Sequence, residues 1–201
     1  QSLSAYDCFA EAFLTWEDFW GAMGVCDIED PDERTAKADY IKFGEWVSAN
    51  YSLEDYNRNY QTDYTAYGQI PIPHRSEPAL WAMYEFYDDF LIDILKRSQQ
   101  YFPNLSMEVR MDWDLVTDKQ GAPVYYQHTK TYDCADSNFS TTMYGIPMGF
   151  ENSGERVSYD EALAKTKYIL EKFKEETGGK AVYIDQFIFA DNTPAFSNNA
   201  Q

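Results

Sequence analysis

The first half of the chain carries apolar residues at helical spacing. Five aromatic residues of the opening segment recur at intervals of three and four residues: Tyr6, Phe9, Phe13, Trp16 and Trp20. Acidic residues fall on the opposite side, at Asp7, Glu11 and Asp18. This period predicts an amphipathic helix over residues 4–24.

Two more helices are expected before the midpoint of the chain. The run 30–33 supplies an Asp as N-cap, a Pro at the first helical position and a Glu at the third, which predicts a helix ending near residue 49. A third helix is expected from Ser76. Its predicted apolar face comprises Leu80, Met83, Tyr84, Tyr87, Leu91 and Leu95.

Tyrosines crowd the stretch 51–75, which shows no sustained period. We expect a long connection with a helical turn at Ser52. A connection longer than ~12–15 residues usually has a function of its own, and tyrosine offers a large contact area with a polar tip. The predicted protein-binding residues are therefore Tyr56, Tyr60, Tyr64 and Tyr67. The alternative is that this segment covers the protein's own core.

Beyond the third helix the period changes to two. Apolar and polar residues alternate over 107–115, which predicts a half-buried strand. A turn at 118–121 and a returning strand over 124–132 would complete a hairpin. A further short strand is expected within 139–150.

The last part of the chain predicts one helix and one strand. Ser158 and Glu161 form a capping box, and the helix that they open should end at the glycine pair 178–179. A strand over 181–189 and a loose tail over 191–201 follow.

Together these elements follow the order ααα-β-β-(β)-α-β. They predict an α+β fold in which N-terminal helices pack on an antiparallel sheet. Neither an internal repeat nor a linker divides the chain, so residues 1–190 are expected to form a single domain, with 191–201 as a tail.

Composition adds a strong negative charge to this picture. The 201 residues hold 34 acidic and 16 basic side chains, which gives a formal net charge of −18 and a pI of about 4.3. A hydrophobic fraction of 44% and an aromatic fraction of 17% nevertheless indicate a folded chain. This charge repels phosphates and anionic lipids, so neither direct nucleic-acid binding nor membrane insertion is expected.

The acidic excess is greatest near the N-terminus. Residues 1–50 contain 11 acids and 3 bases, a net charge of −8. Helix starts account for part of this excess, because acids stabilise the first turn of a helix. The remainder predicts a basic protein partner, for which the candidate binding residues are Asp27, Glu29, Asp32 and Glu33.

The three cysteines, Cys8, Cys26 and Cys134, form no metal-binding or redox motif. On one helix Cys8 and Cys26 would lie ~25 Å apart, beyond the ~7 Å reach of a disulfide, so only a bridge to Cys134 stays open. We expect ordinary thiols in a reducing compartment, in the cytoplasm or a virion. Because the chain starts at Gln1, secretion after removal of a signal is an alternative.

Candidates for acid–base chemistry are few, because the chain has only two histidines, His74 and His128. His74 follows a proline and is expected at the surface. Pairing Thr117 with Ala122 across the hairpin would place His128 on the core face. We prefer this register because it gathers the polar residues of both strands on one face.

A one-residue slip of the hairpin would instead bring His128 beside Asp112 and Asp114. Such a pocket would suit acid–base work or a divalent metal. The run 55–66 begins like a calcium-binding loop, but Tyr60 stands where that loop needs glycine. Common nucleotide, zinc and hydrolase motifs are missing from the sequence. No cofactor, metal or catalytic residue is therefore predicted, and an enzyme is not expected.

Three functions of different classes are consistent with these features. The leading hypothesis is a non-enzymatic protein-binding or assembly subunit, for example of a virion, that uses the tyrosine-rich segment and the acidic helices and is able to form homo-oligomers. The second is an acidic inhibitor, immunity protein or DNA mimic that occupies a basic groove. The third is a small-molecule enzyme with a pocket between the helices and the sheet.

Overall fold

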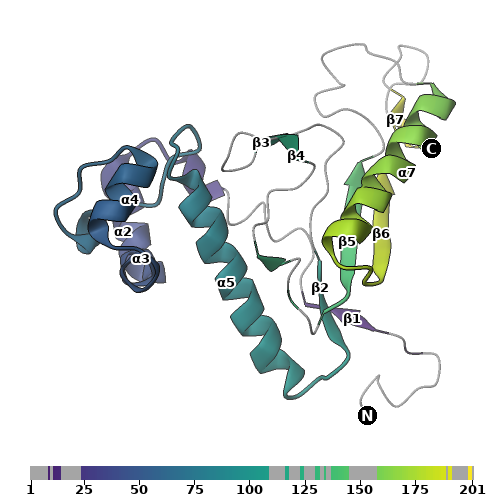
Figure 1. The fold of residues 1–201 in the computed structure, drawn as a ribbon, viewed down its shortest axis with the longest axis horizontal. Helices are drawn as coiled ribbons and strands as arrows, with labels where there is room; N and C mark the ends of the chain where they lie inside the picture. The colour runs from purple at the N-terminus through teal and green to yellow at the C-terminus, as the bar shows by residue number, and fades with distance from the viewer. Residues whose placement is uncertain are drawn as a thin grey trace. The chain divides into compact units, whose positions relative to one another are not determined.

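The computed structural model describes residues 9, 11–14, 24–108, 116–117, 123–124, 130–131, 134, 137–144, 158–188, 190–191 and 199–200. The chain divides into two compact units (Figure 1). We call Asp18–Leu91 the helical unit, and Gln1–Glu17 together with Ile92–Gln201 the sheet unit. The single domain expected over residues 1–190 stays a prediction, since compact units also occur within one domain.

The helical unit consists of short helices and the first part of a long one. Its elements are η2 (Val25–Asp27), α2 (Pro31–Ile41), α3 (Phe43–Asn50), α4 (Leu53–Tyr60), η3 (Tyr67–Gln69) and α5 (Leu80–Gln99). Beyond Leu91, α5 belongs to the sheet unit. The side chains buried at the centre of the helical unit include Phe43, Val47, Tyr56, Ile70, Ile72 and Ala82.

Two of the predicted helices have the expected signals. Asp30 caps α2, because its carboxylate accepts a hydrogen bond from the backbone N–H of Asp32 at 3.0 Å, and Pro31 is the first helical residue. The helix α5 begins at Leu80 rather than at Ser76. Its predicted face is confirmed for the residues that are at most 8% exposed: Met83, Tyr84, Tyr87, Leu91 and Leu95.

The helix expected to end near residue 49 is two helices, because the chain turns at Lys42. Lys42 has a left-handed φ of 63°, and its backbone N–H caps α2. After this turn α3 lies against η3, where a Cβ added to Gly44 would be 2.6 Å from the carbonyl oxygen of Tyr67. Only glycine fits such a close approach of two backbones. A tertiary contact of this kind leaves no trace in the periodicity.

Residues 51–75 are not the long connection that their mixed pattern suggested. Ser52 caps α4, its Oγ accepting the backbone N–H of Asp55 at 3.1 Å, so the predicted helical turn is confirmed and extends over 8 residues. The side-chain amide of Asn57 then holds the backbone that follows α4 in place. It donates to the carbonyl of Tyr64 at 2.8 Å and accepts the N–H of Tyr64 at 3.1 Å.

The sheet unit contains a four-stranded sheet in the order β1-β2-β5-β6. Its strands are β1 (Ala12–Phe13), β2 (Leu105–Glu108), β5 (Phe139–Tyr144) and β6 (Val182–Ile188). Every pairing in this sheet is parallel, so the expected antiparallel sheet is wrong. The helix α7 (Tyr159–Glu176) connects β5 to β6, and a helical crossover is what allows successive strands to run parallel.

The predicted helix over 4–24 is wrong at Ala12–Phe13, because these residues form the strand β1 that pairs with β2; residues 15–23 lie outside the described part of the chain. Aromatic contacts explain the difference. The ring of Phe9 packs on Phe102 at 5.7 Å, and the ring of Phe13 packs on Tyr183 at 5.6 Å. Aromatic residues favour strands wherever a neighbouring strand and its side chains are there to pack against, whatever their spacing.

The strand β2 is buried more completely than its alternating sequence predicted. Ser106, Met107 and Glu108 are 2%, 1% and 4% exposed, so both faces of this strand are covered, as is usual in a parallel sheet. The hydroxyl of Ser106 donates to the carboxylate of Glu11 and accepts the backbone N–H of Asn138 at 3.1 Å. These bonds join the starts of three neighbouring strands.

Two antiparallel ladders of two residues each complete the described strands. One pairs β3 (Val116–Thr117) with β4 (Pro123–Val124). The other pairs β7 (Ala190–Asp191) with β8 (Asn199–Ala200), and all of its residues except Ala190 belong to the expected tail over 191–201. The capping box of α7 and its stop at two glycines, with φ of 66° and 81°, are confirmed. Within the described ranges, no helix is both long and apolar enough to cross a membrane.

Gly44→Ala should destabilise the protein. An alanine in a helix normally stabilises it relative to glycine, but the added Cβ would clash with the Tyr67 carbonyl and force α3 away from η3. Such overpacking typically costs about 1–3 kcal/mol. Urea denaturation followed by circular dichroism measures the change in the free energy of unfolding.

Gly68→Ala is the matched control, because nothing lies within 4 Å of a Cβ at that position. It should leave the free energy of unfolding nearly unchanged. The close approach at Gly44 would be disproved if Gly44→Ala proved as stable as Gly68→Ala.

Candidate functional site

Two of the four predicted binding tyrosines point into the helical unit. Tyr56 is fully buried and Tyr60 is 3% exposed, with their ring centres 4.9 Å apart. Tyr64 and Tyr67 are half-buried, and the hydroxyl of Tyr67 donates to the backbone carbonyl of Tyr51 at 3.1 Å. The segment thus packs largely on its own unit, while a binding role for these four tyrosines stays a prediction.

Burial sets the acid–base behaviour of this tyrosine cluster. The hydroxyl of Tyr51 donates to the carboxylate of Glu85 and lies 3.3 Å from the hydroxyl of Tyr60. Burial and then these hydrogen bonds raise the pKa of Tyr51, and burial also raises the pKa of Tyr56 and Tyr64. These phenols therefore stay protonated at neutral pH, which suits packing and hydrogen bonding rather than a catalytic base.

Two of the predicted acidic residues pair with cations of their own unit. Asp27 holds Arg75 in a two-pronged pair, with N–O distances of 2.5 and 2.8 Å. Glu33 lies 3.4 Å from Lys37, one helical turn further along α2. Both pairs lie at the surface, where ion pairs add little stability, but they account for part of the acidic cluster without a partner.

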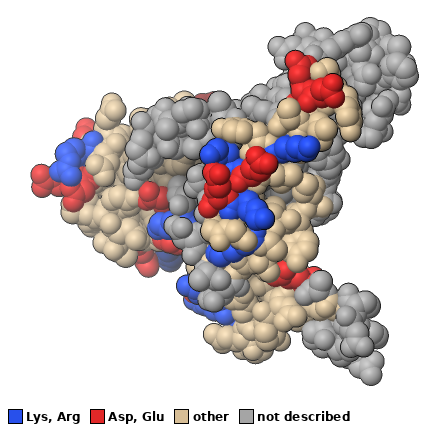
Figure 2. Space-filling model, turned by 45° about the vertical axis from the view of Figure 1, so that its right-hand side comes forward, with Lys and Arg blue, Asp and Glu red and all other residues tan. Residues whose placement is uncertain are grey.

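The other two predicted acids are exposed. Glu29 lies 3.9 Å from the imidazole of His74, and Asp32 is in the first turn of α2. Figure 2 shows that, on the face drawn, the described acidic side chains are interspersed with basic ones. The described acids on that face form no continuous band of the kind a DNA mimic would present.

A buried cation ties α2 to the segment that precedes α5. The side chain of Arg34 is 8% exposed, and its guanidinium donates to the carbonyl of Ile72 at 2.8 Å and to the carboxylate of Glu77 at 3.3 Å. Removing Glu77 would leave the buried guanidinium of Arg34 without its carboxylate. The charge of Arg34 is therefore used inside the unit.

The described cysteines are free thiols. Cys26 and Cys134 are both buried and unbridged, so the disulfide to Cys134 that the sequence left open does not form. Burial raises the pKa of Cys26 to about 12, although the nearby guanidinium of Arg75 opposes the shift. A thiol of this kind is a poor nucleophile.

The predicted pocket residues lie outside the described part of the chain: Asp112, Asp114 and His128. The nearest described ladder pairs Thr117 with Pro123, whereas the preferred register paired Thr117 with Ala122. The preferred register is therefore wrong at this ladder by one residue. Among the residues that the structure does describe, no group of three or more His, Cys, Asp or Glu is placed to hold a metal.

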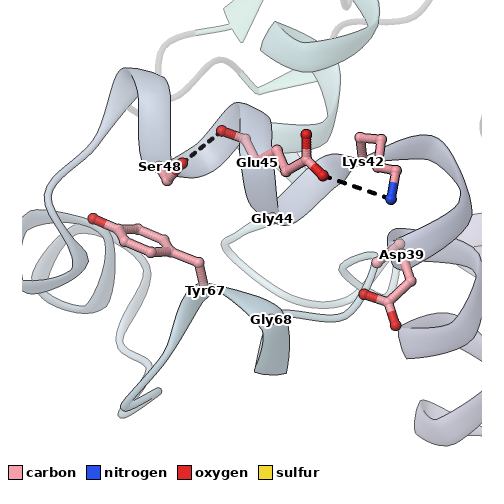
Figure 3. Close-up of a pocket in the computed structure, with 8 residues that line it drawn as sticks. Asp39, Lys42, Gly44, Glu45, Ser48, Tyr67 and Gly68 are labelled. Atoms are coloured by element: carbon pink, nitrogen blue, oxygen red, sulfur yellow. Dashed lines mark hydrogen bonds and ion pairs between the residues drawn. The ribbon is translucent and has the colours of Figure 1, made fainter.

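A small polar pocket lies where α3 meets η3 (Figure 3). It measures about 240 Å³ and is lined by Ala38, Asp39, Lys42, Gly44, Glu45, Ser48, Tyr67 and Gly68. Lys42 pairs with Glu45 at 3.5 Å, and the hydroxyl of Ser48 donates to the carbonyl of Glu45 at 2.8 Å. These exposed groups bind one another and are not held in place for a ligand.

A larger hollow lies between α2 and α5, and we call it the apolar groove. It measures about 730 Å³ and is lined by Val25, Lys37, Tyr40, Ile41, Ile72, Met83, Phe86, Tyr87 and Phe90. Ile72 and Met83 are 1% and 3% exposed and belong to the core, whereas Tyr40 is 87% and Phe90 is 50% exposed. The lining of the apolar groove thus combines buried core residues with two solvent-exposed aromatic rings.

The apolar groove does not follow from the predicted apolar faces, although the sequence contains a signal for it. On α5 the aromatic residues Phe86 and Phe90 stand four residues apart, beside the predicted apolar face and not within it. On α2 the pair Tyr40 and Ile41 widens the apolar surface in the same way. Apolar residues in excess of one core-facing stripe indicate a second contact surface on a helix.

Comparisons with known protein families, with curated proteins and with solved structures gave no match for this chain.

The thiol of Cys26 should react very slowly with iodoacetamide in the folded protein. At pH 8 a thiol of pKa about 12 holds about a thousandfold less thiolate than one at its ordinary pKa of 9.0. Peptide mass spectrometry after labelling in buffer and in urea measures this ratio. Equal labelling of Cys26 in both conditions would contradict its burial.

The same shift predicts how stability depends on pH. The pKa of Cys26 is higher in the folded state than in the unfolded state, so its contribution is complete below pH 9 and is lost as the pH rises towards about 12. Cys26→Ala should therefore flatten the fall of the urea midpoint over this alkaline range. An unchanged slope would contradict the shift.

Proposed function

We propose that the protein is a non-enzymatic binding subunit of a protein assembly and that the apolar groove is its docking surface for a basic protein partner. The observation that carries this proposal is the groove itself, which exposes two aromatic rings beside a buried apolar floor. Exposed apolar surface of this kind marks interaction sites on folded proteins, and aromatic residues dominate the energetics of such sites.

The lining of the apolar groove favours a protein partner over a small molecule. Small-molecule sites combine an apolar wall with several convergent polar groups that fix the ligand. The single charged residue among the groove's lining residues, Lys37, pairs with Glu33 on its own helix. The groove therefore offers contact area without a polar recognition pattern, and this suits the apolar side chains of another protein.

The acidic charge of the helical unit supports a basic partner. Residues 18–91 contain 15 acids and 5 bases, a net charge of −10, which is more than half of the net charge of the chain. Opposite charge on a partner would speed association and orient the encounter. The groove then supplies the contact that holds the complex.

Site-specific crosslinking tests this proposal. A photoreactive phenylalanine is placed at position 90, at position 40 or at the control position 101, and the full chain is irradiated in an extract of its own source. Tyr101 is 89% exposed and does not line the groove. Positions 40 and 90 should crosslink to the same protein, and position 101 should not.

Competition decides whether the crosslink reports the groove. Excess unmodified protein should abolish the crosslink, whereas the double variant Tyr40→Ser and Phe90→Ser should compete at least about tenfold less well, because the loss of two buried aromatic contacts commonly exceeds ~1.4 kcal/mol. Equal competition by both proteins, or equal crosslinking from position 101, would refute the groove as the docking surface.

A further inference from the structure

We infer that the edge of β2 is a binding site for an extended segment with the pattern aromatic–x–Glu–x–aromatic, and that β1 of a second copy of this chain binds there in place of the chain's own β1. In the structure the site holds residues 9–14 of the same chain. The site belongs to the sheet unit, so the inference does not depend on the apolar groove.

The backbone of the bound segment is held as a parallel strand. The N–H of Ala12 donates to the carbonyl of Asn104 at 3.0 Å, and the N–H of Leu14 donates to the carbonyl of Ser106 at 2.8 Å. The edge of a strand is a template on which another extended chain pairs through its backbone. This ladder binds an extended segment without selecting its sequence.

A carboxylate gives the site its specificity. The carboxylate of Glu11 accepts hydrogen bonds from the hydroxyl of Ser106 and from the side-chain amide of Asn138, the latter at 3.0 Å. Other bonds hold both donors. The Ser106 hydroxyl accepts the backbone N–H of Asn138 at 3.1 Å, and the amide oxygen of Asn138 accepts the N–H of Ala181 at 3.3 Å. Two donors positioned by the starts of β5 and β6 form a preorganised site for a carboxylate.

Two aromatic rings flank this carboxylate in the bound segment. The ring of Phe9 packs edge-on against Phe102, which precedes β2, with ring centres 5.7 Å apart. The ring of Phe13 packs against Tyr183 of β6 at 5.6 Å. The sheet unit thus contacts three side chains of the segment, at every second position, and these contacts define the sequence pattern that the site accepts.

A second copy of the chain can supply this segment with every contact preserved. Along the chain, residues 18–91 of the helical unit separate β1 from the remainder of the sheet unit. Exchange of an identical element between copies creates the same contacts and is a low-cost route to association. The choice between the chain's own β1 and that of another copy then depends on their effective concentrations, so exchange should increase with protein concentration.

Disulfide crosslinking between two variants of the full chain tests the inference. Ala12 and Leu105 are paired in the ladder, where neighbouring strands are close enough for a disulfide. One variant carries Ala12→Cys and the other Leu105→Cys, so a disulfide between these positions joins two copies. The variants are mixed under native conditions and oxidised, and peptide mass spectrometry quantifies the product. Tyr101→Cys replaces Leu105→Cys in the matched control, because Tyr101 is 89% exposed and lies outside the ladder.

The disulfide between positions 12 and 105 should form at least about tenfold more than the disulfide between positions 12 and 101, and its yield should rise with protein concentration. Adding Glu11→Ala to the Ala12→Cys variant should lower the yield at least about fivefold, because the donated segment then leaves two donors without their acceptor. Adding Glu11→Ala to the Leu105→Cys variant should raise the yield, because the β1 of that variant then competes less well for its own site.

Two outcomes would overturn exchange between copies: equal yields of the two disulfides, or a Glu11→Ala effect of the same sign in both variants. A peptide of residues 7–17 tests recognition of the segment in the same mixture. It should suppress the disulfide between positions 12 and 105, and the peptide with Glu11→Ala should do so at least about fivefold less effectively. Equal suppression by the two peptides would overturn recognition of the carboxylate.

Discussion

The indole N–H of Trp46, on α3, donates a hydrogen bond to the carboxylate of Asp89, on α5, at 2.9 Å. The same ring packs on Phe43 and Phe86, with ring centres 5.9 and 5.7 Å away. These contacts fix α3 on α5. Because α2 joins α3 through the single residue Lys42, the place of α2 beside α5 depends on them as well. The apolar groove lies between α2 and α5, so a contact on a neighbouring helix sets its width.

Two half-buried acidic side chains of α5 accept hydrogen bonds from aromatic side chains of the helical unit. Glu85 accepts a hydrogen bond from the hydroxyl of Tyr51, and Asp89 accepts one from the indole of Trp46. Neutral donors satisfy a carboxylate yet leave its charge in place. Tyr51 and Trp46 thus accommodate these two carboxylates without removing their negative charge. The helical unit as a whole has a net charge of −10.

The features that the sequence predicted correctly depend on interactions between residues that are close together along the chain. The N-cap at Asp30, the capping box at Ser158, the apolar face of α5 and the glycine stop of α7 all depend on residues within a few positions of one another. Contacts between distant residues decided the rest. The parallel pairing of β1 with β2 and the turn at Lys42 are examples, and the groove combines side chains separated by more than 40 residues. Of the candidate site residues, the sequence predicted acids and tyrosines, whereas the exposed rings of Tyr40 and Phe90 became visible only in the fold.

Methyl NMR of the full chain labelled with [¹³C-methyl]methionine tests the central claim most directly. Met83 lines the apolar groove, whereas Met107 lies in β2 of the sheet unit and is 1% exposed. During titration with the protein that crosslinks at positions 40 and 90, we expect the Met83 methyl signal to shift in a saturable way while the Met107 signal stays in place. A titration in which Met83 does not move, or in which both signals move alike, would contradict docking in the groove.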